Sequence, residues 1–187
     1  TIIHEKPHLA FKDRMRRRKN ALLINDAFAS FRFSECYQKI ATKLEYLQRS
    51  AGEKVFLVTS IAENEGKSTS AANIALALAS RQNKVALIDM DFKKPALYKV
   101  FDIDVQEYND FGSLAANKIT AKDFTLQKYK NTSLYLALNS SSHTDYVDWI
   151  NSKRIMNVIG AFRSMMFDYI IIDSPPISAA ADVTSIL

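Results

Sequence analysis

The segment Val58-Thr-Ser-Ile-Ala-Glu-Asn-Glu-Gly-Lys-Ser-Thr-Ser70 decides the fold of this chain. An apolar run at residues 55–58 precedes it and an Ala-rich run at residues 70–80 follows it, which predicts a strand, a loop and a helix. Backbone N–H groups at the start of a helix point at an anion, and the helix dipole favours negative charge there. Lys67 is placed to reach the outer phosphates of a polyphosphate, and the Ser68 hydroxyl to bind Mg²⁺. We interpret the segment as a nucleotide-binding P-loop, with contacts to the nucleotide from Glu63, Asn64, Glu65, Gly66, Lys67, Ser68 and Thr69.

The loop departs from the usual pattern at one position. The pattern G-x-x-x-x-G-K-[ST] places a glycine five residues before Gly66, where this chain has Ile61. Asn64 can supply the backbone bend instead, because asparagine tolerates the left-handed region better than most residues. The alternative interpretation is an ordinary polar turn before a helix.

The composition indicates one domain with a short extension. The chain has 187 residues, 48% of them apolar, so it can bury a sizeable core. Its single cysteine, Cys36, cannot form an internal disulfide, and no Cys/His cluster indicates zinc, which fits a reducing compartment. No apolar run approaches the roughly 18 residues of a membrane span, and no signal peptide is visible. The first residue is not methionine, so we expect the sequence to be a fragment.

The positive charge is concentrated near the start of the chain. Residues 1–50 carry 11 of the 25 Lys and Arg and 5 of the 20 Asp and Glu, which leaves the remainder with a net charge of −1. This distribution argues against a basic nucleic-acid-binding surface on the domain. We expect residues 1–33 to be a basic extension and residues 34–187 to be the domain. The extension is either a solvated arm or a segment just inside a membrane, and its basic residues are Lys12, Arg14, Arg16, Arg17, Arg18 and Lys19.

Apolar runs and helical periodicity predict alternating strands and helices along the rest of the chain. Strands are expected at residues 55–58, 85–88, 134–138 and 169–172, with a polar surface loop at 139–148. Helices are expected at 34–49 with Ser34 as the N-cap, at 68–81, at 95–100, as one turn at 112–117, after Ser152 and from 179. The helix after Ser152 should bury Ile155, Ile159, Phe162 and Met166, with Trp149 as its anchor. The alternation implies an α/β fold, a parallel sheet with helices on both faces.

Three polar motifs lie at the carboxyl ends of the expected strands. They are the P-loop, the pair Asp89 and Asp91, and Asp173. Ligands in parallel α/β sheets bind beyond these strand ends, so the three motifs should converge on one edge. His4, His8 and His143 have no partner in the sequence that indicates catalysis.

These side chains suit a nucleotide with its metal ion. Mg²⁺ prefers oxygen ligands and takes one or two carboxylates together with phosphate oxygens. We expect Ser68 and Asp173 to bind Mg²⁺, directly or through water, and Asp89 to hold a metal-bound water. Asp91 is then placed to accept a proton from an attacking hydroxyl group or water. The neighbouring lysines either neutralise phosphate charge or form a solvated pair; they are Lys93 and Lys94.

The same motifs resemble those of a known family. Glu65-Gly-Lys-Ser-Thr69, Val85-Ala-Leu-Ile-Asp-Met-Asp-Phe-Lys-Lys-Pro95 and Asp168-Tyr-Ile-Ile-Ile-Asp-Ser-Pro-Pro176 are similar, in order and spacing, to motifs of the bacterial tyrosine kinases of capsular and exopolysaccharide synthesis. The resemblance runs from about residue 34 to the end. It implies an autophosphorylating protein-tyrosine kinase that uses ATP and Mg²⁺ on a P-loop NTPase fold like that of the partition ATPases, with the C-terminal part of the domain missing. The resemblance implies that the catalytic residues are Lys67, Asp89 and Asp91. It also implies that the metal ligands are Ser68, Asp89 and Asp173.

The resemblance also implies a location and a partner. Kinases of this family act at the cytoplasmic face of the bacterial plasma membrane with a membrane polysaccharide chain-length regulator, fused or separate. They phosphorylate a tyrosine cluster near their own C-terminus, in trans within a ring. The ring helix of the family reads E-x-x-R-x-x-R, whereas this chain has Glu35, Gln38 and Ala41, so ring assembly by that motif is not implied. The helix at 34–49 either packs on the domain or forms a subunit contact, and self-association stays an open prediction. Other departures are Glu63-Asn64 for the usual Pro-Gly, Lys93 for an arginine, and an end at Leu187 before any tyrosine cluster.

Two other functions fit part of the pattern. A partner-stimulated switch ATPase of the partition or division-site type shares the sheet and the paired aspartates, but usually has an extra lysine early in its P-loop. The corresponding residues here, Ile61-Ala-Glu-Asn64, contain none. The other is a non-catalytic nucleotide-binding regulator of a membrane polysaccharide assembly, which the altered residues at Gln38 and Ala41 favour.

Overall fold

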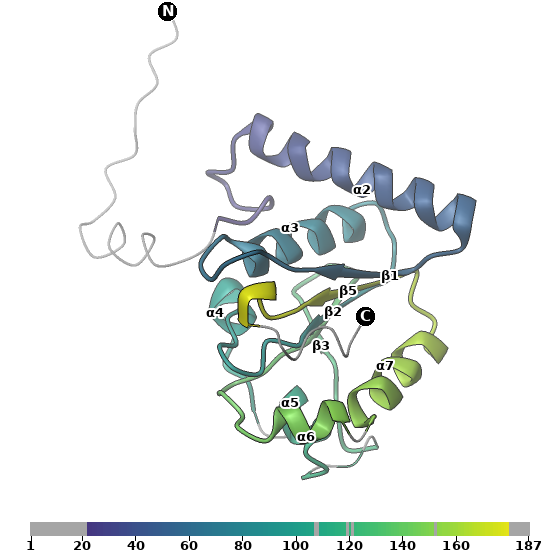
Figure 1. Ribbon diagram of the computed structural model, residues 1–187. Helices are drawn as coiled ribbons and strands as arrows, with labels where there is room; N and C mark the ends of the chain where they lie inside the picture. The colour runs from purple at the N-terminus through teal and green to yellow at the C-terminus, as the bar shows by residue number, and fades with distance from the viewer. Residues whose placement is uncertain (1–21, 107–108, 119, 121, 152, 180–187) are drawn as a thin grey trace, which may run out of the picture.

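A five-stranded, mostly parallel sheet forms the centre of the molecule (Figure 1). The computed structural model describes residues 22–106, 109–118, 120, 122–151 and 153–179. The strand order is β1-β5-β2-β4-β3, in which all neighbours are parallel except β3 and β4. The strands are β1 (Val55–Val58), β2 (Val85–Asp89), β3 (Gln127–Lys128), β4 (Leu134–Ala137) and β5 (Tyr169–Asp173). The four predicted strands are confirmed, and the antiparallel edge strand β3 was not predicted.

Helices cover both faces of the sheet, as the α/β prediction requires (Figure 1). Successive residues of a strand point to opposite faces. In β2, Val85 and Leu87 pack into the core beneath the first helices, whereas Ala86 and Ile88 pack into the core on the other side. One face carries α2 (Phe31–Ala51), α3 (Lys67–Ala79) and α4 (Leu97–Phe101); the other carries α5 (Phe111–Ala115), α6 (Tyr146–Asn151) and α7 (Arg154–Ser164).

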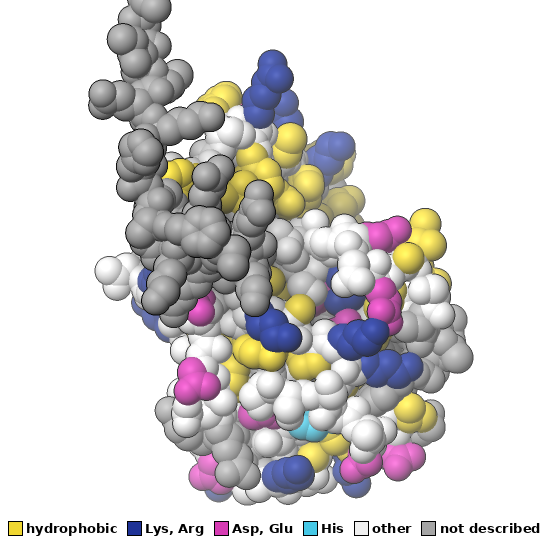
Figure 2. All heavy atoms as spheres, turned by 90° about the vertical axis from the view of Figure 1, so that its left-hand side faces the viewer, with side chains coloured by type: hydrophobic (Ala, Val, Ile, Leu, Met, Phe, Trp, Pro, Cys, Tyr) yellow, Lys and Arg dark blue, Asp and Glu magenta, His cyan; other side chains and the backbone are white. Residues whose placement is uncertain are grey.

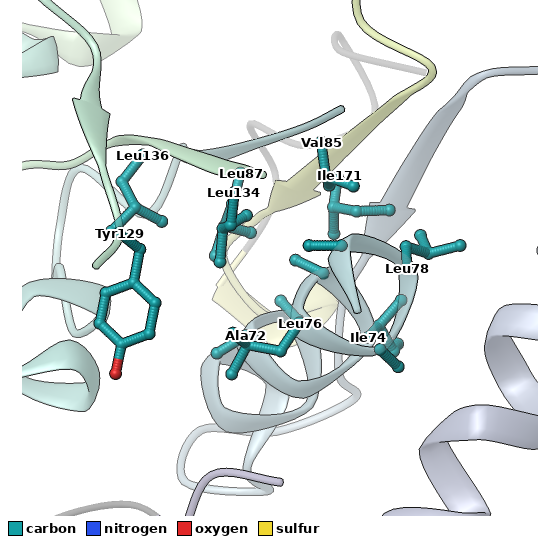
Figure 3. Packing of buried hydrophobic residues seen from close by; sticks show 14 of the residues in the cluster. Ala72, Ile74, Leu76, Leu78, Val85, Leu87, Tyr129, Leu134, Leu136 and Ile171 are labelled. Carbon is teal, nitrogen blue, oxygen red and sulfur yellow. The ribbon is translucent and has the colours of Figure 1, made fainter. Parts of the chain in front are cut away.

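The helix α3 is buried along almost its whole length because its side chains are small. Residues 71–79 are all buried, and alanine at five of these positions lets the helix approach the sheet closely. Figure 3 shows Leu76 and Ala72 beside Leu87, Leu134 and Ile171 of the sheet. Each fully buried leucine or isoleucine contributes about 1.5–3 kcal/mol relative to an exposed one. This packing fixes the end of α3 at which the P-loop lies.

The helix α2 begins earlier than its periodicity predicted. It starts at Phe31, and Ser30 is the N-cap because its Oγ accepts a hydrogen bond from the Phe33 N–H. The prediction that Ser34 caps the helix was wrong: Ser34 lies inside the first turn, where its hydroxyl donates to the Ile24 carbonyl. Gly52 ends the helix with a φ of 72°, a conformation that glycine adopts without strain.

The helix α7 ends earlier than predicted. It stops at Ser164, so Met166 lies beyond it and is 86% exposed instead of buried. Ile155, Ile159 and Phe162 are buried as predicted. The residue predicted to cap the helix, Ser152, lies outside the described residues. The N-cap residue of α7 is Lys153.

The polar segment 139–148 is only partly a surface loop. Its first residue, Asn139, is fully buried, and α6 begins within it at residue 146. Trp149 is 4% exposed, which confirms it as an anchor of the apolar core. At the end of the described chain, residues 177–179 form one turn of 3₁₀ helix, and the helix predicted from 179 lies otherwise outside the described residues.

The residues just before α2 are attached to the domain. The Asn73 side chain of α3 donates to the Leu22 carbonyl and accepts from the Ile24 N–H, and Leu23 is 4% exposed. The packed part therefore includes residues upstream of 34. The basic cluster at 12–19 lies outside the described residues. Among the helices that are described, none has the length and apolar character needed to cross a membrane.

Candidate nucleotide-binding and catalytic site

A pocket of about 310 Å³ lies at the carboxyl ends of the parallel strands. On the face of the molecule that Figure 2 shows, basic and acidic side chains are interspersed. The P-loop forms one wall, and the segments after β2 and β5 form the others. The lining residues are Glu63, Asn64, Gly66, Lys67, Ser68, Thr69, Asp91, Lys93, Lys94, Ala96, Val100, Pro175 and Pro176.

The P-loop has the backbone that its sequence predicted. Asn64 has a φ of 63° and Gly66 a φ of 82°, so asparagine provides the left-handed bend. The Glu65 carboxylate accepts hydrogen bonds from the N–H groups of Ile61 and Ala62. Of the seven predicted nucleotide contacts, Glu65 alone does not line the pocket, because its side chain closes the loop on itself.

Lys67 brings the three strand ends together. Its Nζ lies 2.8 Å from Asp91 Oδ2 and 3.4 Å from Asp173 Oδ1, and its contact with Ser68 Oγ is 3.2 Å. The side chain of Lys67 is 11% exposed, so these contacts are largely shielded from water. Asp89 is fully buried beside Asp173, since the two residues are paired across β2 and β5. The predicted convergence of Lys67, Asp89 and Asp173 is confirmed.

The carboxylates are crowded around one cation. Burial raises the pKa of Asp173 to about 6, against the opposing effects of the Lys67 charge and a hydrogen bond from Ser68. Burial and the charges of Asp173 and Asp91 raise the pKa of Asp89 well above its ordinary value. Burial acts to lower the pKa of Lys67, but the carboxylates of Asp173 and Asp91 outweigh it and raise that pKa. Three carboxyl groups, those of Asp89, Asp91 and Asp173, therefore surround the Lys67 ammonium.

The site fits a magnesium ion that arrives with phosphates. Within the described part of the chain, no group of three or more His, Cys, Asp or Glu side chains is arranged to hold a metal by itself. Asp89 Oδ2 and Asp173 Oδ2 are nevertheless buried and have no hydrogen-bond partner among the described residues. Unpartnered carboxylate oxygens next to the Ser68 hydroxyl provide oxygen ligands for a cation that takes its other ligands from water and phosphate.

Asp91 is held by a turn as well as by Lys67. Its N–H donates to Asp89 Oδ1 over 3.1 Å, and its Oδ1 accepts from the Lys94 N–H over 3.0 Å. The Lys94 ammonium lies 2.6 Å from Glu63 Oε2, so an ion pair connects the P-loop to the segment after β2. Lys93 and Lys94 both line the pocket, which agrees with a role near phosphates.

Hydrogen bonds connect the segment after β5 to the start of the P-loop. The sequence did not indicate this connection. The N–H groups of Ser174, Ile177 and Ser178 donate to carbonyls of residues 58, 60 and 61, and the Thr59 hydroxyl donates to the Pro175 carbonyl. Pro175 and Pro176 consequently form part of the pocket wall. The run Asp173-Ser-Pro-Pro176 was read for its carboxylate only, although two prolines after a strand indicate a fixed, non-helical path.

The fold and the site together define a P-loop NTPase. The sequence model of the ParA family, described as "NUBPL iron-transfer P-loop NTPase", matches residues 52–186. The chain belongs to this family of P-loop NTPases, whose fold binds a nucleotide, typically with Mg²⁺. The single cysteine, Cys36, is exposed on α2 and does not line the pocket, so the site offers no thiolate for iron.

Individual proteins and solved structures are also similar to this chain. Tyrosine-protein kinase YwqD of Bacillus subtilis (strain 168) is 30% identical over 150 residues, which are 80% of this chain and 61% of that protein. The crystal structure of the chimerical protein CapA2B2 is similar with a TM-score of 0.75 and 26% identity, over 88% of this chain and 70% of that one. Septum site-determining protein MinD of Escherichia coli (strain K12) is 26% identical over 122 residues, 65% of this chain and 44% of MinD.

These comparisons confirm the predicted fold class and the predicted resemblance to bacterial tyrosine kinases. The chain spans about three fifths of the length of YwqD. The similarity to MinD extends over a smaller part of this chain.

Proposed function

We propose that this chain belongs to an ATP-dependent protein-tyrosine kinase that phosphorylates itself and regulates capsular or exopolysaccharide synthesis and export. One observation carries the proposal: the Lys67 ammonium contacts Asp91 and Asp173, carboxylates from two neighbouring strand ends, at the mouth of the P-loop. The similarity to a named tyrosine-protein kinase over 80% of the chain supports the same activity.

The loop residues and Lys67 bind the triphosphate of ATP in this proposal. Gly66, at the N-cap of α3, orients backbone N–H groups towards the phosphates, and the Lys67 charge stabilises negative charge that develops on the transferred group. Ser68, Asp89 and Asp173 would hold Mg²⁺ directly or through water. When bound, Mg²⁺ neutralises phosphate charge and fixes the orientation of the phosphate groups.

Asp91 is the proposed general base. Its carboxylate forms an ion pair with the Lys67 ammonium. Phosphate groups that bind Lys67 compete for that ammonium, so Asp91 becomes able to accept a proton. The tyrosine oxygen forms a bond to the γ-phosphorus, its proton passes to Asp91, and the bond to the β-phosphate oxygen breaks to leave ADP.

The proposal includes a location and partners. The protein acts at the cytoplasmic face of the bacterial plasma membrane, where the basic cluster at residues 12–19 is the segment near the membrane. The kinase domain includes residues upstream of 34, because Leu23 is buried and Asn73 of α3 holds the backbone of Ile24. Its partner is a membrane polysaccharide chain-length regulator, and nucleic acid is not a partner. Self-association through the motif positions of α2 is not supported, because Ala41 is fully buried and Gln38 accepts a hydrogen bond from Arg81 of the same chain.

The experiment compares the full-length protein with its Lys67→Ala variant. Both are incubated with ATP and Mg²⁺, and phosphotyrosine is measured together with released phosphate. We expect phosphotyrosine on the wild type and at least about a 10³-fold lower rate in the variant, because a cation on the transferred phosphate is typically worth that much. An equal phosphotyrosine signal from the two proteins would refute the proposal.

A switch ATPase is the second candidate, favoured by the ParA-family match. The residues early in the loop, Ile61-Ala-Glu-Asn64, contain no lysine, and Glu63 puts a carboxylate there instead. Steady ATP hydrolysis that a partner stimulates, without phosphotyrosine, would establish this function. ATP binding with neither product would instead establish the non-catalytic regulator.

A further inference from the structure

Asn139 is a buried polar residue to which the proposed mechanism gives no role. It lies two residues beyond the end of β4 at Ala137 and is fully buried. Its Nδ2 donates a hydrogen bond of 2.8 Å to the backbone carbonyl of Asp89. Because a carbonyl only accepts, this contact determines which atom of the amide faces β2. A buried asparagine at the end of a third strand therefore touches the segment that carries both aspartates.

The peptide group between Asp89 and Met90 is held from both sides. Its carbonyl accepts from Asn139, and its N–H donates to the Asp173 carbonyl over 2.8 Å. The regular register of β2 with β4 ends at Ile88 and Ala137. The Asn139 side chain thus continues the lateral support of β2 beyond the ladder. Here the side-chain amide of Asn139 makes the hydrogen bond to β2 that a backbone N–H of β4 would make within the sheet.

This peptide leads directly to the proposed base. The Asp91 N–H donates to Asp89 Oδ1, and Asp91 Oδ2 contacts the Lys67 ammonium at 2.8 Å. A displacement of the Asp89 carbonyl therefore moves Asp91 relative to Lys67 and the pocket. Displacements of about 1 Å in a reacting group can cost about 10²-fold in rate.

We propose that Asn139 is a positioning residue for Asp91. Its amide fixes the path of residues 89–91, so that the Asp91 carboxylate meets the acceptor hydroxyl at the proper distance. The effect on turnover rests on the proposed kinase function, whereas the effect on the backbone of residues 89–91 does not.

Asn73 supplies a matched control. It is also fully buried, and its side chain likewise holds backbone, since Nδ2 donates to Leu22 and Oδ1 accepts from Ile24. Its contacts lie on the side of α3 that faces the chain entering α2, outside the pocket lining. Replacing either asparagine by alanine removes a comparable buried contact, but only Asn139 touches the strand end that bears Asp91.

The first measurement is amide hydrogen exchange in the full chain without nucleotide. We expect Asn139→Ala to raise the exchange rate of residues 88–92 by at least about tenfold, and Asn73→Ala to raise exchange at residues 22–30 instead. Unchanged exchange at 88–92 in Asn139→Ala would overturn the proposal. This measurement is independent of any enzymatic activity, so it stands even if the wild type forms no phosphotyrosine.

The second measurement is single-turnover phosphotyrosine formation at saturating ATP and Mg²⁺. We expect Asn139→Ala to lower the rate by about 10–10²-fold with the Kd for ADP within twofold of the wild type. Asn73→Ala should keep the wild-type rate per folded molecule. Equal losses of rate in the two variants, or a loss confined to nucleotide affinity, would show a structural role only. Absence of phosphotyrosine from the wild type would refute the kinase function. The exchange result would then decide alone whether Asn139 holds the backbone of residues 89–91.

Discussion

Two networks of charged and polar groups lie at opposite ends of α3, and they differ in how completely they are satisfied. At the C-terminal end, Arg81 donates to Gln38, Thr42 and Glu45, and Asn83 adds a further hydrogen bond to Glu45. Every one of these donors finds an acceptor on α2. At the N-terminal end, Lys67 faces three carboxylates and leaves buried oxygens without partners among the described residues.

The difference separates a structural network from a binding site. Buried polar groups are normally paired, and an unsatisfied carboxylate costs free energy that the rest of the fold must offset. The Arg81 network connects α2 to the domain and needs nothing else. The Lys67 network leaves carboxylate oxygens of Asp89 and Asp173 without partners among the described residues, and a cation with phosphate groups would satisfy them. The following predictions test this contrast.

The largest expected effect is on catalysis. Asp91→Asn keeps an acceptor for the Lys94 N–H but removes the charge and the proton acceptor. We expect phosphotyrosine formation to fall by about 10²–10⁴-fold while ATP still binds. The matched variant Glu45→Gln, in the Arg81 network, should leave the rate per folded molecule unchanged. Similar rates for Asp91→Asn and the wild type would show that Asp91 is not the base.

The next effect is on stability and comes from the other network. Arg81→Met removes four hydrogen bonds between the turn after α3 and α2. We expect the free energy of unfolding to fall by about 2 kcal/mol, since partly buried acceptors lose their charged donor. Urea unfolding measures this loss. Arg81→Lys should recover little of it, because lysine cannot reproduce the planar fork. If Arg81→Met instead changed the free energy of nucleotide binding more than the free energy of unfolding, the contrast between the two networks would be wrong.

A third prediction concerns pH in the nucleotide-free protein. The pKa of Asp173 is raised to about 6 in the fold, above the value of about 3.9 in an unfolded chain. The proton therefore stabilises the folded state, and this contribution is complete below the unfolded pKa and is lost as pH rises through about 6.

Asp173→Asn carries no such charge at any pH. We expect its free energy of unfolding, relative to wild type, to increase by roughly 2 kcal/mol between pH 4 and pH 8. Urea unfolding at a series of pH values tests this. A difference between variant and wild type that does not change with pH would contradict the crowding of carboxylates around Lys67.

The smallest effect concerns the ion pair that connects the loop to β2. Glu63→Gln releases the Lys94 ammonium, which lines the same pocket. We expect ATP·Mg²⁺ to bind about 2–3-fold more tightly, because exposed pairs of this kind are worth less than about 1 kcal/mol. Titration calorimetry can measure the change. Glu35→Gln, which breaks an exposed pair with Lys39 on α2, is the control and should not alter affinity.

The sequence predicted the parts of the fold that depend on local pattern. Four strands were found because each is a continuous apolar run, and the convergence of the aspartates was found because they follow such runs directly. The strand β3 was missed because two residues, Gln127 and Lys128, carry no periodicity. The start of α2 was misplaced because Ser30 and Ser34 are both good caps, and only the path of the preceding chain decides between them.

Contacts within the site depended on information that the sequence does not contain. That Lys67 contacts Asp91 follows from the position of β2 next to β5, which a single sequence does not state. Asn139 was placed in a surface loop because polar residues after a strand usually face water. Its burial is visible only when β4 is placed beside β2.

The hydrogen bonds between the start of the P-loop and residues 174–178 have a mechanical consequence. Three backbone bonds and the Thr59 side chain fasten the two segments together, so neither can shift alone. We therefore expect any rearrangement of the loop around phosphates to displace residues 174–178 as well.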